Sequence, residues 1–354
     1  MARLAQLKLS MTVAVLLVPI IFALFLGAIV FFLQVYLQLW AWYYSIILVV
    51  AATIVFVLFQ FLIGPAIVRF STRLRYLHPG ENPWLESTVK DLADKSGIPM
   101  PRLAIVPDKT PNAFVFGRSS KGATLALHEG LLNKLNEDEV RGVIGHELGH
   151  VRHKDFLVMT ALSALPLLAY LIARGTFEAA WLSGRTSRKK EGESVGAALF
   201  IIAAISFVVY IVSLLCVMRL SRLREHYADA YSAYVTESPR ELESALTKIT
   251  FGLSLSPKPP HGARTLYIGD PALAKQEAQS IISKKEEYDL DKDGVLDERE
   301  LELAMEKEAK STWRKINTWF TTHPATFQRI LLLREIEKEM ESGIYSSKRI
   351  YAKI

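Results

Sequence analysis

The sequence contains a single cysteine, Cys216, among 354 residues. An intramolecular disulfide and a metal site built from several cysteines are therefore excluded. Charge is also scarce, because Asp, Glu, Lys and Arg make up 22% of the residues against 51% hydrophobic ones, which excludes an intrinsically disordered chain. Residues 9–68 form 60 consecutive positions without a formal charge or a histidine. No soluble domain needs such a stretch, so the sequence predicts a membrane protein with soluble parts.

The surplus of basic over acidic side chains is modest. The 42 Lys and Arg against 36 Asp and Glu leave a net charge of +6. Basic loops beside lipid head groups explain such a surplus, so it gives no support to nucleic-acid binding. We expect the lipid bilayer as a partner and no nucleic acid, and the sequence does not indicate an oligomeric state.

Four apolar runs predict membrane helices arranged as two hairpins. They are Met11–Leu33 and Ala41–Gly64 in the first hairpin, and Phe156–Ala173 and Val195–Met218 in the second. The third run has only 18 residues, with Pro166 inside, so the second hairpin either spans the membrane or dips in and returns. Basic residues flank the first hairpin, which by the positive-inside rule places both of its outer ends in the cytoplasm. The basic segment 174–194 conflicts with four simple spans.

The rest of the chain predicts a soluble part with helices and a few strands. Asn82 before Pro83 indicates a helix that Gly97 ends, and Asn136 with Glu139 three residues later indicates the start of another. Between them, residues 102–107, 113–118 and 123–128 are typical of short strands. We therefore expect four regions: an N-terminal transmembrane hairpin (1–70), a soluble part with strands (71–155), a second hydrophobic hairpin (156–218) and a mainly helical part (219–354).

The second predicted helix carries the pattern HExxH at His146, Glu147 and His150. Positions i and i+4 share one helix face, so both imidazoles can bind one zinc ion while Glu147 serves as the base. A catalytic zinc needs a third protein ligand, and Glu225 is the candidate. His150 precedes the third apolar run by six residues and Glu225 follows the fourth by seven, which places them at matching depth. His226 is the rival ligand.

These residues resemble a known family. HExxH followed, after a hydrophobic hairpin, by Arg224-Glu225-His226-Tyr227-Ala228-Asp229 is similar to the HtpX-type membrane zinc endopeptidases and their relatives, the CAAX prenyl proteases. The segments Pro111–Phe114 and Thr322-His323-Pro324, with Arg329 after them, belong to the same resemblance. It implies a mainly α membrane protein with a zincin-like α+β catalytic domain in the cytosol that contains a small β-sheet. It favours Glu225 over His226 as the third ligand.

The resemblance also implies roles for further residues. Asp229 would hold a zinc-ligand histidine, His323 would stabilise the oxyanion and Arg329 would hold Glu225. Substrate would pair with an exposed strand edge, and the residues implied in that cleft are Asn112, Ala113, Ala123, Thr124, Leu125, Ala126 and Leu127. His153 and Asp155 are expected to be polar residues at the membrane interface.

Residues 289–300 match the EF-hand calcium loop at every ligand position. The expected ligands are Asp289, Asp291, Asp293, the carbonyl of Val295, Asp297 and Glu300. We expect a lone loop without a partner hand to bind calcium weakly, and such a loop is not a fixed feature of the HtpX-type pattern. Calcium is therefore a possible second metal beside one catalytic zinc.

The sequence predicts a multi-pass zinc endopeptidase of the cell membrane with its active site facing the cytoplasm. Its expected substrates are membrane or misfolded proteins, in protein quality control. Two alternatives stay open: a prenyl-protein protease of the CAAX type, and a zinc-binding membrane scaffold or chaperone without proteolytic activity. The intact Glu147 disfavours the scaffold, since a protein without hydrolytic activity has no need of the base.

Overall fold

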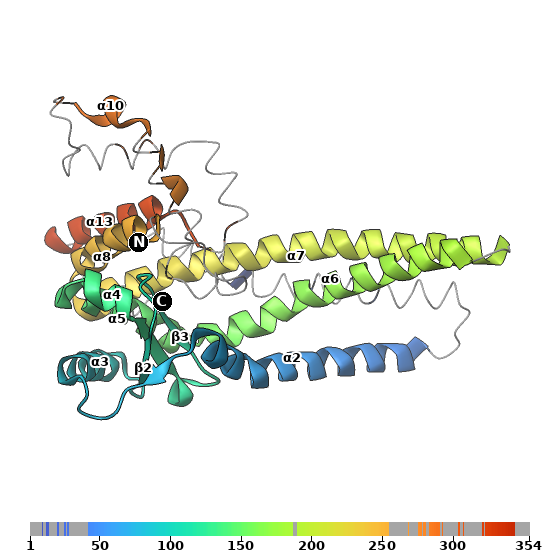
Figure 1. Cartoon of the computed structure of the whole chain (residues 1–354), viewed down its shortest axis with the longest axis horizontal. Coiled ribbons are helices and arrows are strands. Elements are labelled where there is room, and N and C mark those ends of the chain that lie inside the picture. The colour runs from blue at the N-terminus through green and yellow to red at the C-terminus, as the bar shows by residue number, and fades with distance from the viewer. Residues whose placement is uncertain are drawn as a thin grey trace. The chain divides into compact units, whose positions relative to one another are not determined.

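The computed structural model describes residues 42–186, 190–254 and 323–343, together with isolated positions outside these ranges (Figure 1). It divides the chain into two compact units. The mixed unit comprises Met1–Leu9, Pro65–Phe156 and Ser221–Ile354. The helical unit comprises Ser10–Gly64 and Leu157–Leu220.

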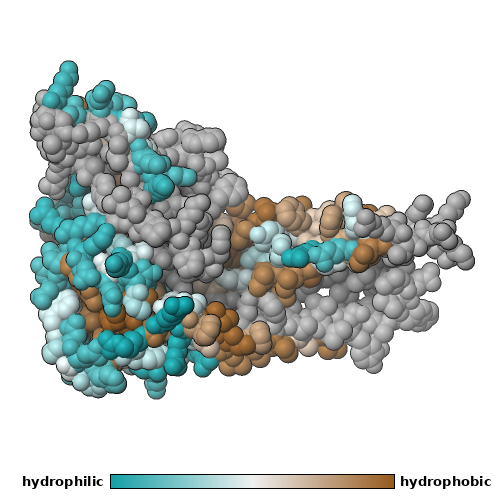
Figure 2. Space-filling view, viewed as in Figure 1, coloured by the Kyte–Doolittle hydropathy of each residue, from teal (hydrophilic) through white to brown (hydrophobic). Residues whose placement is uncertain are grey.

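The helical unit is built from parts of three long helices. These are α2 (Trp42–Thr72), α6 (Asp155–Thr186) and α7 (Lys190–Thr236), so most of the predicted basic loop 174–194 is helical and Pro166 lies inside α6 without ending it. Large hydrophobic side chains lie exposed along all three helices (Figure 2). Among the described residues, the segment Gly196–Thr236 is long and apolar enough to cross a membrane. The run Met11–Leu33 lies outside the described residues except for isolated positions.

The mixed unit contains a four-stranded sheet in the order β1-β2-β4-β3. Its strands are β1 (Arg75–Tyr76), β2 (Arg102–Val106), β3 (Ala113–Phe116) and β4 (Thr124–His128), and a 3₁₀ turn, η1 (Ser120–Gly122), separates the last two. β2 and β4 are parallel, whereas β1 on β2 and β3 on β4 are antiparallel. The sequence analysis predicts β2, β3 and β4 within a few residues of their bounds and misses the two-residue β1.

Helices surround this sheet in the mixed unit. They are α3 (Pro83–Ser96), α4 (Glu129–Lys134), α5 (Glu137–His153), α8 (Pro239–Ser254), α10 (Lys285–Tyr288) and α13 (Thr326–Glu341). The predicted start of α3 is confirmed, because the Asn82 side chain accepts a hydrogen bond from the Leu85 N–H, and Gly97 ends the helix with a φ of 62°. The start of α5 is also confirmed, by a capping box between Asn136 and Glu139.

The two faces of the sheet pack into separate hydrophobic cores. Leu103, Leu125 and Leu127 belong to a large core that also contains side chains of α3, α5, α8 and α13. Ala104, Phe114 and Ala126 point to the other face, where Leu74 and Val68 cover them. The alternation of side chains along β2 and β4 therefore divides residues between a core under the helices and a smaller core near the end of α2.

Two glycines of α5 allow other helices to approach it closely. A Cβ added at Gly142 would lie 2.6 Å from the backbone nitrogen of Leu242 in α8. A Cβ added at Gly149 would lie 3.1 Å from Tyr231 Cδ1 and 3.3 Å from Ala228 Cα, both in α7. These separations are at or below contact distance, so glycine is what lets α7 reach the helix that carries HExxH.

The predicted calcium loop lies outside the described residues apart from Asp289, Leu290 and Lys292. The short helix α10 precedes it, and Tyr288 at its end is buried. The loop therefore stays a prediction from sequence.

Candidate metal centre and active site

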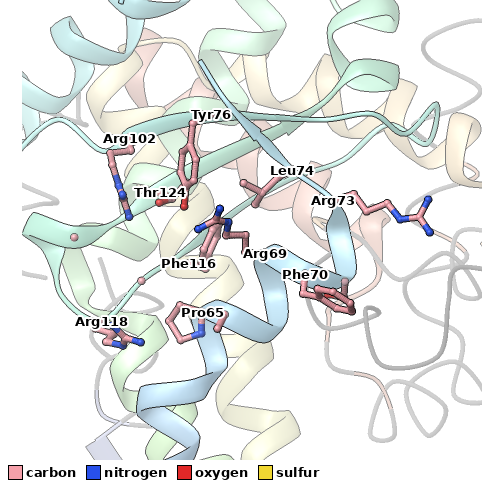
Figure 3. Close-up of a pocket in the computed structure, with 14 residues that line it drawn as sticks. Pro65, Arg69, Phe70, Arg73, Leu74, Tyr76, Arg102, Phe116, Arg118 and Thr124 are labelled. Atoms are coloured by element: carbon pink, nitrogen blue, oxygen red, sulfur yellow. The ribbon is translucent and has the colours of Figure 1, made fainter. Parts of the chain in front are cut away.

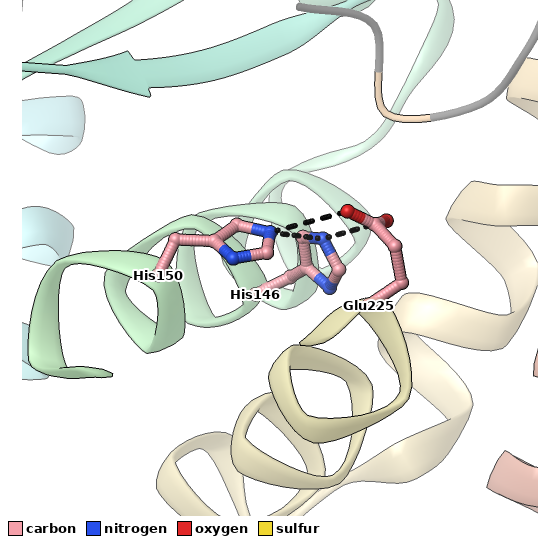
Figure 4. A group of neighbouring side chains, drawn as sticks. All are labelled: His146, His150 and Glu225. Atoms are coloured by element: carbon pink, nitrogen blue, oxygen red, sulfur yellow. Dashed lines mark hydrogen bonds and ion pairs between the residues drawn. The ribbon is translucent and has the colours of Figure 1, made fainter. Parts of the chain in front are cut away.

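Three predicted ligands come together in the mixed unit. His146 and His150 lie on one face of α5, and Glu225 reaches them from α7 (Figure 4). One ligand atom from each residue lies within 4.8 Å of the others. The Nε2 atoms of the two histidines are 3.2 Å apart, and the carboxylate oxygens of Glu225 lie 3.7 Å from His146 Nε2 and 3.6 Å from His150 Nε2. The rival ligand His226 is not part of this cluster.

A carboxylate holds the outer nitrogen of each histidine. His146 Nδ1 lies 2.9 Å from Asp229 Oδ1, and His150 Nδ1 lies 2.7 Å from Asp155 Oδ2. A carboxylate at Nδ1 fixes the proton there and leaves the Nε2 lone pair free. The two lone pairs then point toward the same place at close range, which is favourable only with a cation between them.

Two buried arginines hold these carboxylates in turn. Arg329 donates to both oxygens of Asp229, from Nε at 2.9 Å and from a terminal nitrogen at 2.7 Å, and Arg224 bonds Asp155. Arg329 also lies 3.3 Å from Glu225 Oε2, and only 1% of the residue is exposed to solvent. Such fork-shaped, desolvated pairs fix the geometry of the groups they hold.

The remaining predicted catalytic residues are buried at the same cluster. Glu147 is 3% exposed, and burial raises its pKa above the ordinary value of 4.5, although His150 and His146 act in the opposite direction. A raised pKa brings a general base closer to neutral pH. His323, just before α13, has its Nδ1 3.4 Å from Glu225 Oε2.

The donor set fits a zinc ion. Two neutral imidazoles and one carboxylate are a ligand set that catalytic zinc uses, with further positions left for water and substrate. Glu225 Oε2 is buried and accepts no hydrogen bond in the described part of the chain, although Arg329 and His323 lie within ion-pair distance of it. His146, His150 and Glu225 would hold the ion, and Asp229 and Asp155 would orient the two histidines.

The structure contradicts the predicted role of the strand at residues 123–127. β4 is paired on both sides, with β2 and with β3, so it has no free edge for a peptide. Its side chains lie in the two cores: Ala123, Leu125 and Leu127 on one face, and Ala126 on the other. Thr124 is also fully buried. The alternating pattern identifies a strand, but strand order depends on the parallel pairing with β2, which no local pattern encodes.

Asn112 also differs from the prediction. Asn112 is 1% exposed, and its side-chain oxygen accepts a hydrogen bond from the Ile268 N–H at 2.8 Å. Arg329 in turn donates to the Ile268 carbonyl. Asn112 therefore holds Ile268, which contacts Arg329, rather than lining an open cleft. Ala113 is buried at the start of β3, the strand whose outer edge is unpaired in the described part of the chain.

Sequence analysis misses two residues of the site. Asp155 is 6% exposed and bonds His150, so it supports a candidate ligand, a role that was not predicted for it. Arg224 is its partner. The sequence offers only a weak signal for Asp155, its position five residues after His150. Asp155 faces His150 because Lys154 has a φ of 57° and turns the chain between α5 and α6.

Comparisons with known proteins identify the family of the chain. Residues 79–337 match the model of peptidase family M48. The protease HtpX homologue of Methanothermobacter thermautotrophicus is 38% identical over 195 residues, which cover 55% of this chain and 70% of that protein. The protease HtpX homologue of Thermococcus kodakarensis is 35% identical over 269 residues, which cover 75% of this chain and 77% of that protein.

Among solved structures, Ste24p of S. mikatae matches with a TM-score of 0.44 and 15% sequence identity. This match covers 93% of this chain and 66% of that one. Since the family match spans most of the sequence and includes HExxH, Glu225 and Arg329, the chain belongs to peptidase family M48 and is similar to its HtpX proteases.

Proposed function

We propose that this M48 peptidase is a zinc endopeptidase embedded in the cell membrane that hydrolyses membrane or misfolded proteins at the cytoplasmic face. The observation that carries the proposal is the cluster of His146, His150 and Glu225, whose ligand atoms lie within 4.8 Å of one another beside Glu147. The protease names of the relatives support hydrolysis of polypeptides. The quality-control role comes from the resemblance to HtpX-type enzymes.

The reaction divides between a bound metal and the side chains around it. A zinc ion at this site would supply a Lewis acid, which lowers the pKa of water and polarises a carbonyl. Glu147 takes one proton from the attacking water, whose oxygen bonds to the carbonyl carbon, and returns a proton to the amine as the C–N bond breaks. His323 faces the same cluster and would stabilise the charge that develops on the carbonyl oxygen. Asp229, Asp155 and Arg329 keep the ligands in place.

Strand addition remains the proposed mode of substrate binding, at a different strand. Within the described part of the chain, β3 pairs only with β4, so its outer edge is free. β3 also contacts α5, the helix that carries Glu147. An extended peptide paired with β3 would receive main-chain hydrogen bonds and lie along the side of the sheet that adjoins α5.

A multi-pass membrane location is supported by sequence and by exposed apolar surface. The uncharged stretch 9–68 and the helix Gly196–Thr236 are both long enough to span. Exposed hydrophobic side chains along α2, α6 and α7 suit contact with lipid (Figure 2). We assign the active site to the cytoplasmic side because basic residues flank the first hairpin.

The first experiment compares wild type with Glu147→Gln, purified in detergent, on an unfolded protein substrate. Glu137→Gln serves as a control because Glu137 lies exposed in the first turn of the same helix, and zinc content is measured in all three proteins. We expect zinc in all three proteins and cleavage by wild type and the control only. Zinc without cleavage in any of them favours the scaffold, and wild type without zinc contradicts the proposal. Selective cleavage of prenylated peptides would favour the CAAX-type activity.

A further inference from the structure

A second cavity lies in the mixed unit, away from the metal ligands. Its volume is about 1020 Å³, and it opens over the face of the sheet that carries Phe116, where Leu74 packs (Figure 3). The residues that line it include four arginines and no acidic side chain: Arg69, Arg73, Arg102 and Arg118. None of the candidate zinc ligands lines it. The cavity is therefore a separate, positively charged place in the fold.

Two of these arginines gather around one tyrosine. The guanidinium carbon of Arg69 lies 5.7 Å from the centre of the Tyr76 ring, and that of Arg102 lies 5.0 Å from it. Within the described residues, neither arginine forms an ion pair with a carboxylate. The neighbouring Arg75 differs, because Glu81 binds it at 2.6 Å and it does not line the cavity. Arg69 and Arg102 are both exposed, so their two positive charges beside one ring are accessible to an anion from solvent or from a lipid surface.

Thr124 supplies an independent signal. It starts β4, is 0% exposed and lines the cavity. Its hydroxyl is buried and has no hydrogen-bond partner in the part of the chain that the structure describes. A buried hydroxyl without a partner is unfavourable, and an oxyanion in the cavity would accept a hydrogen bond from it. Figure 3 shows the side chains of Arg69 and Arg102 reaching toward Tyr76 and Thr124, whereas Arg73 points away from them.

We propose that this cavity binds a phosphate group through Arg69, Arg102 and the hydroxyl of Thr124. Guanidinium groups bind phosphate oxygens through charge-assisted hydrogen bonds, and a hydroxyl adds one more donor. The source that the structure favours is the headgroup of an anionic phospholipid. Arg69 is the first charged residue after the uncharged stretch 9–68, and the next side chain, Phe70, is 89% exposed at the cavity. The first arginine after a membrane-spanning stretch lies near the membrane surface, at the depth of the charged lipid headgroups.

The phosphate chemistry does not depend on the proposed proteolysis, and the lipid source depends only on the membrane location. Lipid binding is measured on the full chain in detergent by native mass spectrometry. Short-chain phosphatidylglycerol is compared with phosphatidylcholine, with and without inorganic phosphate as a competitor. The variants are Arg69→Gln with Arg102→Gln, and Thr124→Val, which exchanges a hydroxyl for a methyl group of similar shape. The control is Arg75→Gln, which removes the same charge outside the cavity.

We expect wild type to prefer phosphatidylglycerol and the double variant to lose about tenfold or more in affinity, because two charge-assisted contacts are removed. Thr124→Val should lose about threefold to tenfold, and Arg75→Gln should stay within about twofold. Zinc content and circular dichroism establish that each variant is folded, and if the double variant is not, Thr124→Val decides. Displacement of the lipid by inorganic phosphate identifies a soluble phosphate as the ligand. Binding that is equal in wild type and both cavity variants overturns the proposal.

Discussion

Asp155→Asn tests whether the carboxylate behind His150 controls metal binding. One Asp155 oxygen lies 2.7 Å from His150 Nδ1, and the other binds Arg224. Asparagine keeps the volume but has only one oxygen for these two donors. The asparagine amide N–H group would then face either the imidazole N–H of His150 or the guanidinium of Arg224, so one of these donors loses its acceptor. The loss is costly because the site is buried: Asp155 is 6% exposed.

The size of the effect follows from these contacts. A buried donor left without an acceptor costs about 1–3 kcal/mol. Loss of an outer carboxylate behind a metal-binding histidine weakens metal affinity by about 10- to 100-fold, which corresponds to about 1.4–2.7 kcal/mol. We therefore expect zinc affinity to fall within that range while the fold is retained.

The assay is a zinc titration against a competing chelator, with thermal unfolding of the same preparations. Asp229→Asn makes the equivalent change behind His146 and should lose at least as much affinity, since Arg329 donates twice to that carboxylate. Asp91→Asn, on the exposed surface of α3, is the control and should change nothing. A folded Asp155→Asn protein with zinc affinity within about twofold of wild type would refute the role assigned to Asp155.

Three further predictions concern the helix α5 and the calcium loop. Gly149→Ala should separate α5 from Ala228 in α7, lower stability by about 1–3 kcal/mol and weaken zinc binding, as measured by denaturant unfolding and metal titration. For Glu139, burial raises the pKa, but Lys248, Ser244 and the Asn136 N–H together lower it below 4.5. Its charge therefore stabilises the fold at neutral pH, and the stability gap to Glu139→Gln should shrink as pH falls below about 4.5, which unfolding across pH 3–7 checks. Calorimetric titration of the full chain with calcium should give heat that Glu300→Gln loses, and no heat with wild type would remove the EF-hand prediction.

Local signals in the sequence predict the elements of the mixed unit well. The caps of α3 and α5 follow from Asn82, Gly97 and the pair Asn136 and Glu139, because each requires only contacts within one turn. HExxH is equally local, since helix geometry alone places His146 and His150 on one face. The role of a residue can therefore be predicted from the sequence when it depends only on residues within about one helical turn.

Contacts between distant segments are where the sequence is insufficient. The position of β4 in the middle of the sheet depends on its parallel pairing with β2, so the strand that was predicted to offer a free edge has none. Asp155 faces His150 only because of the left-handed turn at Lys154, and lysine gives no local signal for that conformation. The cavity at Arg69, Arg102 and Thr124 joins a helix end to two strands, and no motif connects these residues.

Asp155 and Arg224 also lie where the chain leaves and re-enters the mixed unit. Between them runs the segment Leu157–Leu220 of the helical unit, and their ion pair joins positions 69 residues apart. The same carboxylate orients His150, and the residue after Arg224 is the third ligand, Glu225. The two chain crossings and the metal ligands therefore depend on one set of directional contacts, whereas α5 packs on the sheet through apolar contacts, which have no preferred direction. A displacement that separates the crossings would disturb His150 and Glu225 before it disturbed the sheet.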